Sequence, residues 1–252
     1  MTDSKKEISA QTDTLFTKTV EKGSFAFDQA VARVFPDMIR RSVPGYAETV
    51  AMSGIIANRY LQPNSCIYDL GCSLGAVTLA MRHAVSANPA MASSKLIGID
   101  NSQAMIEQAG HYVAIDDCDI PVELHCADIL DLEIQQASVV TLNFVLQFIE
   151  QSQRSELLTK ICQGILEGGA LVLSEKIAFE DSEQATQNEL HWDFKRANGY
   201  SDMEIAQKRN AIEDVLVPES HEVHVERLKQ AGFSQVVRWY QCFNFVSYLA
   251  IK

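Results

Sequence analysis

The sequence predicts an α/β fold: a mostly parallel seven-stranded sheet with helices on both faces and an antiparallel hairpin near the C-terminus. The first observation is that short β-rich runs alternate with helical patterns from residue 61 onward, which is typical of parallel strands joined by helices. The second is a pair of β-rich runs at the end of the chain, which predicts the hairpin. The third is size, because 252 residues with 47% apolar content can bury one substantial core.

The region before residue 61 contains no strand pattern and is interpreted as a helical cap, residues 1–60. Proline is accepted in the first turn of a helix and disfavoured in its interior. Three helices are therefore expected, at 27–35, at 37–43 after Pro36, and at 45–61 after Pro44.

The rest of the chain carries the alternating pattern. Strands are expected at 66–71, 95–100, 122–129, 138–145, 170–176, 233–241 and 243–252. The main helices between them are expected at 76–85, 102–114 and 152–165. The last of these helices is expected to stop at Gly168 and Gly169.

Composition argues against several classes of protein. A formal net charge of −12 opposes binding to a phosphate backbone, so small-molecule substrates are expected and direct binding of nucleic acid is not. No run approaches the roughly 18 apolar residues of a membrane helix, and the N-terminus lacks a signal-peptide pattern. The six cysteines form no C-x-x-C pair and are expected to be buried thiols of a cytoplasmic protein. No metal site is expected, and His221 and His224 are interpreted as a solvated helix face.

The segment GCSLG, residues 71–75, follows the first predicted strand and fits two chemistries. As G-x-S-x-G it is the nucleophile elbow of a serine hydrolase, with Ser73 attacking an ester. As the glycine-rich turn after a first strand, it contacts a nucleotide, and the serine has no covalent role. The second interpretation is favoured, because an elbow follows strands that have already built an oxyanion loop and no HGGG-type segment lies upstream. The dinucleotide pattern G-x-G-x-x-G does not fit this turn either.

An acidic residue at the end of the second predicted strand strengthens the interpretation of this turn as part of a nucleotide site. Ligands of an open parallel sheet bind beyond the carboxyl ends of its strands, where Asp100 can accept hydrogen bonds from a ribose diol. Taken one by one, these positions have structural explanations, since glycine permits backbone angles that other residues avoid. In combination, Asp69, Gly71, Ser73, Gly75 and Asp100 resemble the S-adenosylmethionine site of class I methyltransferases, which implies a Rossmann-like fold.

Longer segments extend this resemblance from a fold to a family. They lie at 27–46, 68–76, 98–108, 142–150, 168–176, 191–201 and 241–250. On these segments the chain resembles the carboxy-S-adenosyl-L-methionine synthases, bacterial enzymes that supply the carboxymethyl donor for 5-oxyacetyluridine at the tRNA wobble position. The resemblance runs from about residue 25 to the C-terminus. It departs in the first 20 residues and at 84–94, and neither departure touches a site motif.

The resemblance implies a reaction and an assembly. S-adenosylmethionine and prephenate would be the substrates, and carboxy-S-adenosylmethionine, phenylpyruvate and water the products. S-adenosylmethionine would thus be a substrate that gains a carboxyl group on its methyl carbon, with no metal taking part. The family is dimeric, so a homodimer is expected.

The resemblance also implies how S-adenosylmethionine is held. Its ribose would be bound by Asp100 and Asn101, and its adenine by Asp128 and Ile129. Gly71, Cys72 and Ser73 would line its methionine end, and Asn143 would lie under the sulfonium. Tyr46 would close over the ligand from the N-terminal helices.

By the same resemblance, Arg209 would bind the added carboxylate and is the residue assigned to catalysis, because a guanidinium matches a carboxylate with two parallel hydrogen bonds. Arg209 lies in a predicted helical insertion, 176–219, within the Rossmann-like domain, 61–252. We expect the insertion to act as a lid that excludes water and to form a single structural unit with the rest of the chain. Nearby Lys195 and Lys208 are interpreted as ion-paired residues on helix faces.

Two other functions stay open at this point. One is an ordinary small-molecule methyltransferase, which needs a base or an acceptor-binding residue instead of a carboxylate clamp. The other is a non-catalytic module that binds S-adenosylmethionine.

Overall fold

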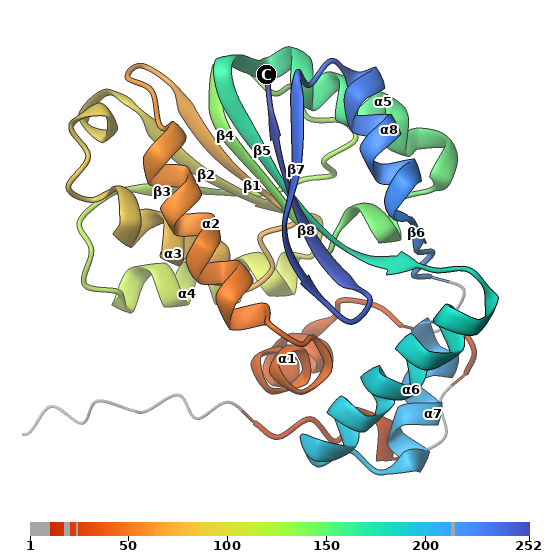
Figure 1. Cartoon of the computed structure of the whole chain (residues 1–252). Coiled ribbons are helices and arrows are strands. Elements are labelled where there is room, and N and C mark those ends of the chain that lie inside the picture. The colour runs from red at the N-terminus through yellow and green to blue at the C-terminus, as the bar shows by residue number, and fades with distance from the viewer. Residues whose placement is uncertain (1–10, 18–20, 24, 213–214) are drawn as a thin grey trace, which may run out of the picture.

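The computed structural model describes residues 11–17, 21–23, 25–212 and 215–252. Its centre is a mixed sheet in the order β3-β2-β1-β4-β5-β8-β7, in which β8 runs antiparallel to β5 and to β7 (Figure 1). The strands are β1 Cys66–Leu70, β2 Lys95–Asp100, β3 Val122–Cys126, β4 Ala137–Asn143, β5 Ile165–Ala178, β6 Glu219–Ser220, β7 Gln235–Cys242 and β8 Phe245–Ile251. The seven predicted strands and the C-terminal hairpin are confirmed, and β6 is an additional two-residue strand that pairs with the end of β5.

The helices surround this sheet. They are α1 Gln29–Ser42, α2 Tyr46–Tyr60, α3 Ala76–Val85, α4 Gln103–Ile115, α5 Gln151–Gly164, α6 Asp181–Ala197, α7 Asp202–Ile212 and α8 His221–Ala231. The short 3-10 helices are η1 Leu15–Thr17, η2 Pro89–Ser93 and η3 Leu146–Phe148. The helix α5 ends at Gly164, so Gly168 and Gly169 lie inside β5 and do not end the helix as predicted. No described helix is both long and apolar enough to cross a membrane.

Pro36 does not separate two helices. It lies inside α1, which begins after Asp28, whose carboxylate accepts hydrogen bonds from the amides of Ala30 and Val31. A proline inside a helix removes one backbone hydrogen bond and costs about 3 kcal/mol. The prediction of two helices is wrong because the apolar residues on both sides of Pro36, including Val34 and Met38, are buried along one continuous helix.

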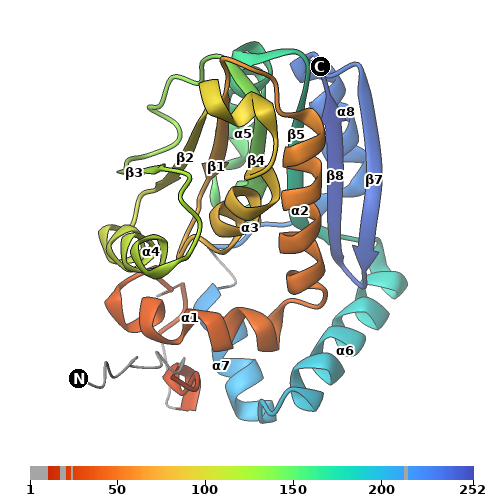
Figure 2. The same cartoon turned by 90° about the vertical axis from the view of Figure 1, so that its left-hand side faces the viewer.

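The two faces of the sheet are covered by different helices (Figures 1 and 2). Alternate residues of β1 point to opposite faces: Ile67 packs in a cluster with Met81 of α3, and Leu70 packs in another with Leu158 of α5. α2, α3 and α4 therefore cover one face, and α5 and α8 cover the other. Both faces of the central strands are buried, as is usual for parallel strands.

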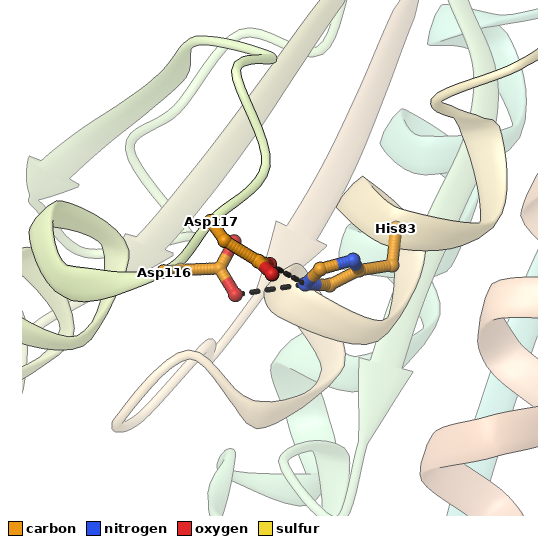
Figure 3. Close-up of side chains that lie close together, drawn as sticks. All are labelled: His83, Asp116 and Asp117. Carbon is orange, nitrogen blue, oxygen red and sulfur yellow. Dashed lines mark hydrogen bonds and ion pairs between the residues drawn. The ribbon is translucent and has the colours of Figure 1, made fainter.

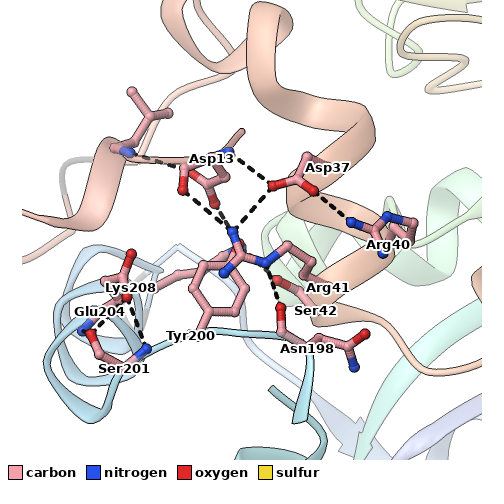
Figure 4. Close-up of polar contacts among 11 residues, drawn as sticks. Asp13, Asp37, Arg40, Arg41, Ser42, Asn198, Tyr200, Ser201, Glu204 and Lys208 are labelled. Atoms are coloured by element: carbon pink, nitrogen blue, oxygen red, sulfur yellow. Dashed lines mark hydrogen bonds and ion pairs between the residues drawn. The ribbon is translucent and has the colours of Figure 1, made fainter. Parts of the chain in front are cut away.

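Helices α1, α6 and α7 gather at one end of the sheet (Figures 1 and 2). A buried polar network joins them (Figure 4). Arg41 of α1 donates to Asp37 and to the carbonyl of Asn198 after α6, and its guanidinium lies 3.8 Å from the centre of the Tyr200 ring. The Tyr200 hydroxyl donates to the carboxylate of Asp13, which is itself buried. This network ties α6 and α7 to α1 and to the segment around Asp13.

Two further expectations need correction. His221 and His224 do not form a solvated face: Nδ1 of His221 lies 2.9 Å from the Tyr248 hydroxyl, and His224 is buried against the same ring. All six cysteines are free thiols, but only two are fully buried and Cys126 is exposed. In both cases, packing of a helix or strand edge against its neighbours decided the exposure, which the local pattern does not reveal.

The end of the insertion is held by a carboxylate between two guanidinium groups. Glu219 accepts hydrogen bonds from Arg154 of α5 and from Arg227 of α8. Burial opposes the ionisation of Glu219, but the hydrogen bonds from Arg227 and Arg154 outweigh it and hold its pKa at about 2, below the ordinary 4.5. A carboxylate whose folded pKa is depressed stabilises the fold above its unfolded pKa, and this contribution is lost as pH falls from 4.5 toward 2.

Glu219→Gln should therefore lower the free energy of unfolding at neutral pH by on the order of 2 kcal/mol, because the buried guanidinium groups of Arg154 and Arg227 lose their counter-ion. The difference from the wild type should shrink as the pH is lowered through about 4. Urea unfolding at several pH values measures both effects. Glu226→Gln, at an exposed position of the same helix region, is the control. A pH-independent difference between wild type and Glu219→Gln would show that Glu219 does not stabilise the fold as an ionised group.

Candidate functional site

A cavity of about 480 Å³ lies at the carboxyl ends of β1, β2 and β4, next to α1, α6 and α7. Nine of the ten residues that the family resemblance assigns to the ligand line it: Tyr46, Gly71, Cys72, Ser73, Asp100, Asn101, Asp128, Ile129 and Asn143. Arg209 is not among the lining residues. The cavity therefore joins residues that are separated by almost a hundred positions in the sequence.

The turn after β1 forms one wall of the cavity. The amides of Gly71 and Cys72 both donate to the carbonyl of Ile99 at 2.8 Å, which binds the turn to the end of β2. Gly71 has φ +72°, and a Cβ atom there would lie 2.3 Å from Cγ2 of Val145, so only glycine fits. Ser73 also has a positive φ, and its hydroxyl contacts Met105 Sδ at 3.5 Å. Among the described residues no histidine hydrogen-bonds Ser73, so the nucleophile-elbow interpretation has no base to support it.

Asp100, the last residue of β2, links the turn to the next helix. Its Oδ2 accepts from the amide of Ser73 and its Oδ1 from the amide of Ser102, both at 2.9 Å. Burial raises the pKa of Asp100, while these two backbone hydrogen bonds oppose the shift. Each carboxylate oxygen can accept a second hydrogen bond. Asp100 therefore lines the cavity with hydrogen-bond acceptor capacity to spare.

Asp69 lies deeper, at the floor of the cavity. Its two oxygens accept hydrogen bonds from the hydroxyls of Thr78 on α3 at 2.6 Å and Thr141 on β4 at 2.7 Å. Burial raises the pKa of Asp69 to about 6. The thiol of the adjacent Cys72 also has a raised pKa, because it is buried and near Asp69 and Asp100. Cys72 is therefore a neutral thiol that shapes the wall rather than a nucleophile.

Asn143 ends β4 and faces the cavity. Its Oδ1 accepts from the hydroxyl of Ser174 at 2.6 Å, which fixes the orientation of the amide. The next residue, Phe144, has φ +60°, an uncommon angle for a bulky side chain. The Phe144 ring packs against Tyr46, the first residue of α2, with ring centres 6.4 Å apart. Strained backbone of this kind often lies at ligand sites.

Asn101, Asp128 and Ile129 lie at the other side of the cavity, beyond the ends of β2 and β3. Asn101 and Asp128 are exposed at the rim, and Ile129 is buried. One carboxylate oxygen of Asp128 accepts from the amide of Leu130 at 2.9 Å, which holds the side chain in a fixed turn.

The insertion contributes different cations from those predicted. Lys195 of α6 and Lys208 of α7 line the cavity, so their interpretation as surface ion pairs is wrong. On α7, Ile205, Lys208 and Ile212 recur at helical spacing and face the interior, and the residue after Lys208 points away. Arg209 is accordingly exposed, and its guanidinium lies 5.7 Å from the centre of the Trp192 ring.

Sequence reasoning missed several lining residues. Lys176 lies near the carboxyl end of the buried strand β5, and His191 shares one face of α6 with Lys195 at i, i+4 spacing. That spacing was the signal in the sequence from which His191 and Lys195 could have been assigned to the same side of the helix. Phe245 of β8 also lines the cavity, and its ring lies 4.9 Å from the imidazole of His191. Nε2 of His191 donates to the carbonyl of Ser42, and burial, with the charges of Lys195 and Lys176, lowers the histidine pKa to about 2.

One group of potential metal ligands occurs among the described residues: His83, Asp116 and Asp117 (Figure 3). Asp116 already pairs with the guanidinium of Arg82 at 2.8 Å, in addition to His83 at 2.7 Å. The side chain of Asp117 is 95% exposed. Exposed acidic groups of this kind are common without an ion, and the group is not part of the cavity, so the expectation of a metal-free reaction stays a prediction.

Comparison with known proteins identifies the class. Residues 67–169 match the family described as methyltransferase domain. The human N-acetylserotonin methyltransferase, solved in complex with SAM, superposes with a TM-score of 0.57 at 16% identity, over 89% of this chain and 55% of that one. A cyclopropane synthase from Mycobacterium tuberculosis superposes with a TM-score of 0.55 at 13% identity, over 75% and 62% of the two chains. The fold and site define an enzyme of the class I methyltransferase fold that uses S-adenosylmethionine.

More similar sequences narrow this class to a family. The carboxy-S-adenosyl-L-methionine synthase of Marinobacter nauticus is 60% identical over 96% of this chain and 95% of that protein. The proteins of the same name from Hahella chejuensis and Yersinia enterocolitica are 54% and 50% identical, over 91% and 96% of this chain and 94% and 90% of theirs. The chain belongs to the carboxy-S-adenosyl-L-methionine synthase family.

Proposed function

We propose that this chain joins S-adenosylmethionine and prephenate to give carboxy-S-adenosylmethionine, phenylpyruvate and water. The observation that carries the proposal is the cavity: nine residues that the family resemblance assigns to S-adenosylmethionine line one space at the carboxyl ends of the strands. The product would serve as the carboxymethyl donor for the wobble uridine of tRNA.

The reaction needs a carbanion at the methyl carbon of S-adenosylmethionine. The adjacent sulfonium makes that carbon acidic, and prephenate supplies both the base and the carboxyl group. Prephenate loses carbon dioxide from its ring carbon, and its ring hydroxyl leaves as hydroxide, which takes a methyl proton and becomes water. The resulting ylide attacks the carbon dioxide, which forms the new carbon–carbon bond. No electron or proton is left over in this sequence.

The protein's part in this reaction is to orient the substrates and to exclude water, because an ylide in water is reprotonated. Asp100 would accept from the ribose hydroxyls, and Asp128 from the adenine amino group. Asn143, held by Ser174, would lie under the sulfonium. Helices α6 and α7 would act as a lid, and their buried network with α1 supports this role (Figure 4).

Arg209 stays a prediction within this proposal. The side chain is exposed and outside the cavity. It would therefore bind the carboxylate of a ligand in this cavity only after a rearrangement of α7, or it would bind a ligand in the cavity of a second subunit.

The direct test is product formation. Purified protein is incubated with prephenate and with S-adenosylmethionine that carries an isotopic label in the methyl group, and the products are analysed by mass spectrometry. We expect S-adenosylmethionine plus one carboxyl group, with the label retained, and phenylpyruvate in equal amount. Transfer of the labelled methyl group to another molecule would instead identify an ordinary methyltransferase. If neither substrate is converted, the remaining hypothesis is a non-catalytic module that binds S-adenosylmethionine.

Three further features belong to the same proposal. We propose that the protein is a homodimer and works in the cytoplasm. We also propose that it does not bind tRNA directly, because a net charge of −12 repels the phosphate backbone. Sedimentation velocity reports the assembly, and a monomer would contradict it. Tight, salt-sensitive binding of bulk tRNA would contradict the last expectation.

A further inference from the structure

Two lysines in the cavity have no anionic partner among the residues that the structure describes. Lys176 of β5 and Lys195 of α6 both line the cavity, and in the part of the chain that the structure describes neither ammonium group forms an ion pair or a side-chain hydrogen bond. The acid next to Lys176 in sequence, Glu175, is fully buried and accepts instead from the amides of Leu146 and Gln147 at 3.0 and 2.9 Å. The acid nearest to Lys195 in sequence, Asp193, pairs with Arg196. A partly buried ammonium without a counter-ion is unfavourable, and a bound anion would relieve this.

A third lysine completes the basic end of the cavity. Lys208 is buried and donates to the hydroxyl of Ser42 at 2.7 Å, and its Nζ lies 4.0 Å from a carboxylate oxygen of Asp13 (Figure 4). Burial lowers the pKa of Lys208 to about 7 and lowers that of Lys195 well below its ordinary value, where the charges of Lys208 and Lys176 add to the effect. Lys195 thus lies near both other ammonium groups, and Lys208 is the one already held by protein groups.

The opposite end of the cavity is acidic. Asp69, Asp100 and Asp128 line it around the turn after β1 and the ends of β2 and β3. None of these carboxylates pairs with the lysines among the described residues. The cavity therefore separates a region suited to a cation and ribose hydroxyls from a region suited to anions.

Aromatic rings connect the two ends. Tyr46 packs on Phe144, Phe144 packs on Phe245 with ring centres 6.0 Å apart, and Phe245 packs on the imidazole of His191 at 4.9 Å. Phe144 directly follows Asn143, and His191 shares a helix face with Lys195. An unsaturated six-membered ring would find apolar contacts along this wall, with the lysines at its end.

We propose that Lys176 and Lys195 bind the carboxylates of the ring dicarboxylate substrate, prephenate, and that Lys208 supports them from a position held by Ser42 and Asp13. This inference rests on the proposed function and names the substrate site for it. The placement puts the substrate ring between the lysines and Asn143, next to the methyl group that is to be carboxylated. S-adenosylmethionine also carries a carboxylate, so the same lysines could serve its methionine end, and the test separates these two uses.

The test measures binding without turnover. S-adenosylhomocysteine lacks the methyl group that would be carboxylated, so protein saturated with it binds prephenate but cannot react. Lys176→Met and Lys195→Met remove a charge while keeping an unbranched side chain. We expect each to raise the Kd of prephenate by about tenfold or more, to change the Kd of S-adenosylhomocysteine by less than about threefold, and to keep or raise Tm, because a desolvated charge is removed. Lys195→Arg should bind prephenate better than Lys195→Met.

The control is Arg196→Met, which removes a cation one residue away on the exposed side of α6, where Arg196 pairs with Asp193 and Asp202. Its prephenate binding should equal that of the wild type. Unchanged prephenate binding in both lysine variants would overturn the inference, as would equal weakening of S-adenosylhomocysteine, which would assign the lysines to the methionine carboxylate. A loss confined to Arg209→Ala, measured in parallel, would assign the carboxylates to that residue.

The inference and the proposed function can fail separately. If the wild type binds prephenate through the lysines but forms no carboxylated product, the anion site stands and the reaction does not. If the wild type forms the product and the lysine variants bind prephenate normally, the reaction stands and the substrate carboxylates are held elsewhere.

Discussion

Asp100→Ala should weaken the binding of S-adenosylmethionine by about 10- to 100-fold, which corresponds to the loss of one or two hydrogen bonds to a charged acceptor. The carboxylate has two tasks that the substitution removes together. It would receive the ribose hydroxyls, and it already holds the amides of Ser73 and Ser102, which would be left without an acceptor. Calorimetric titration of the purified variant measures the change.

The comparison with other ligands and variants makes this result specific. S-adenosylhomocysteine should weaken in parallel, because it carries the same ribose, whereas the lysine variants should spare it. Asp117→Ala, at an exposed position outside the cavity, should bind like the wild type. Asp100→Asn should fall between, since an amide oxygen still accepts one hydrogen bond while its NH₂ group faces a donor. A folded Asp100→Ala protein with an unchanged Kd would remove Asp100 from the ligand site.

Gly71→Ala should lower the free energy of unfolding by about 3 kcal/mol and abolish detectable binding of S-adenosylmethionine. The residue has φ +72°, which alone costs about 1 kcal/mol for a residue with a Cβ atom. The new atom would also overlap Val145, whose β-branched side chain has few alternative rotamers. Relief requires a shift of the segment that follows Asn143, and that segment forms a wall of the cavity.

Gly75→Ala is the matched comparison. Gly75 has an equally unfavourable φ of +83°, but the nearest atom to an added Cβ is Ala109 Cβ at an ordinary 3.6 Å. Its loss should be about 1 kcal/mol, from the backbone angle alone. Chemical unfolding of the two variants measures the difference. Equal losses would mean that the contact with Val145 relaxes easily and that the turn after β1 tolerates a side chain at residue 71.

The extent of prediction from sequence differs between parts of this protein. The sheet and its hairpin were predicted from local alternation of strand and helix patterns, whereas the lining residues from Tyr46 to Asn143 were named largely through the family resemblance. Most of these residues end or follow a strand, as Asp100 and Asn143 do, and the carboxyl ends of parallel strands meet at one edge of the sheet. Long, similar sequence segments added the family, which the relatives confirm.

The insertion was decided by tertiary structure. The basic residues of α6 and α7 are close together in sequence, and neither composition nor charge tells which of them faces inward. The rotation of each helix is set by what it packs against: residues near Lys208 are buried by contact with α1 and with the segment around Asp13, almost two hundred positions away. As a result of this packing, Lys195 and Lys208 face the cavity, whereas Arg209 is exposed outside it. Long-range packing also explains why α1 continues past Pro36: the apolar contacts of one continuous helix outweigh a lost backbone hydrogen bond.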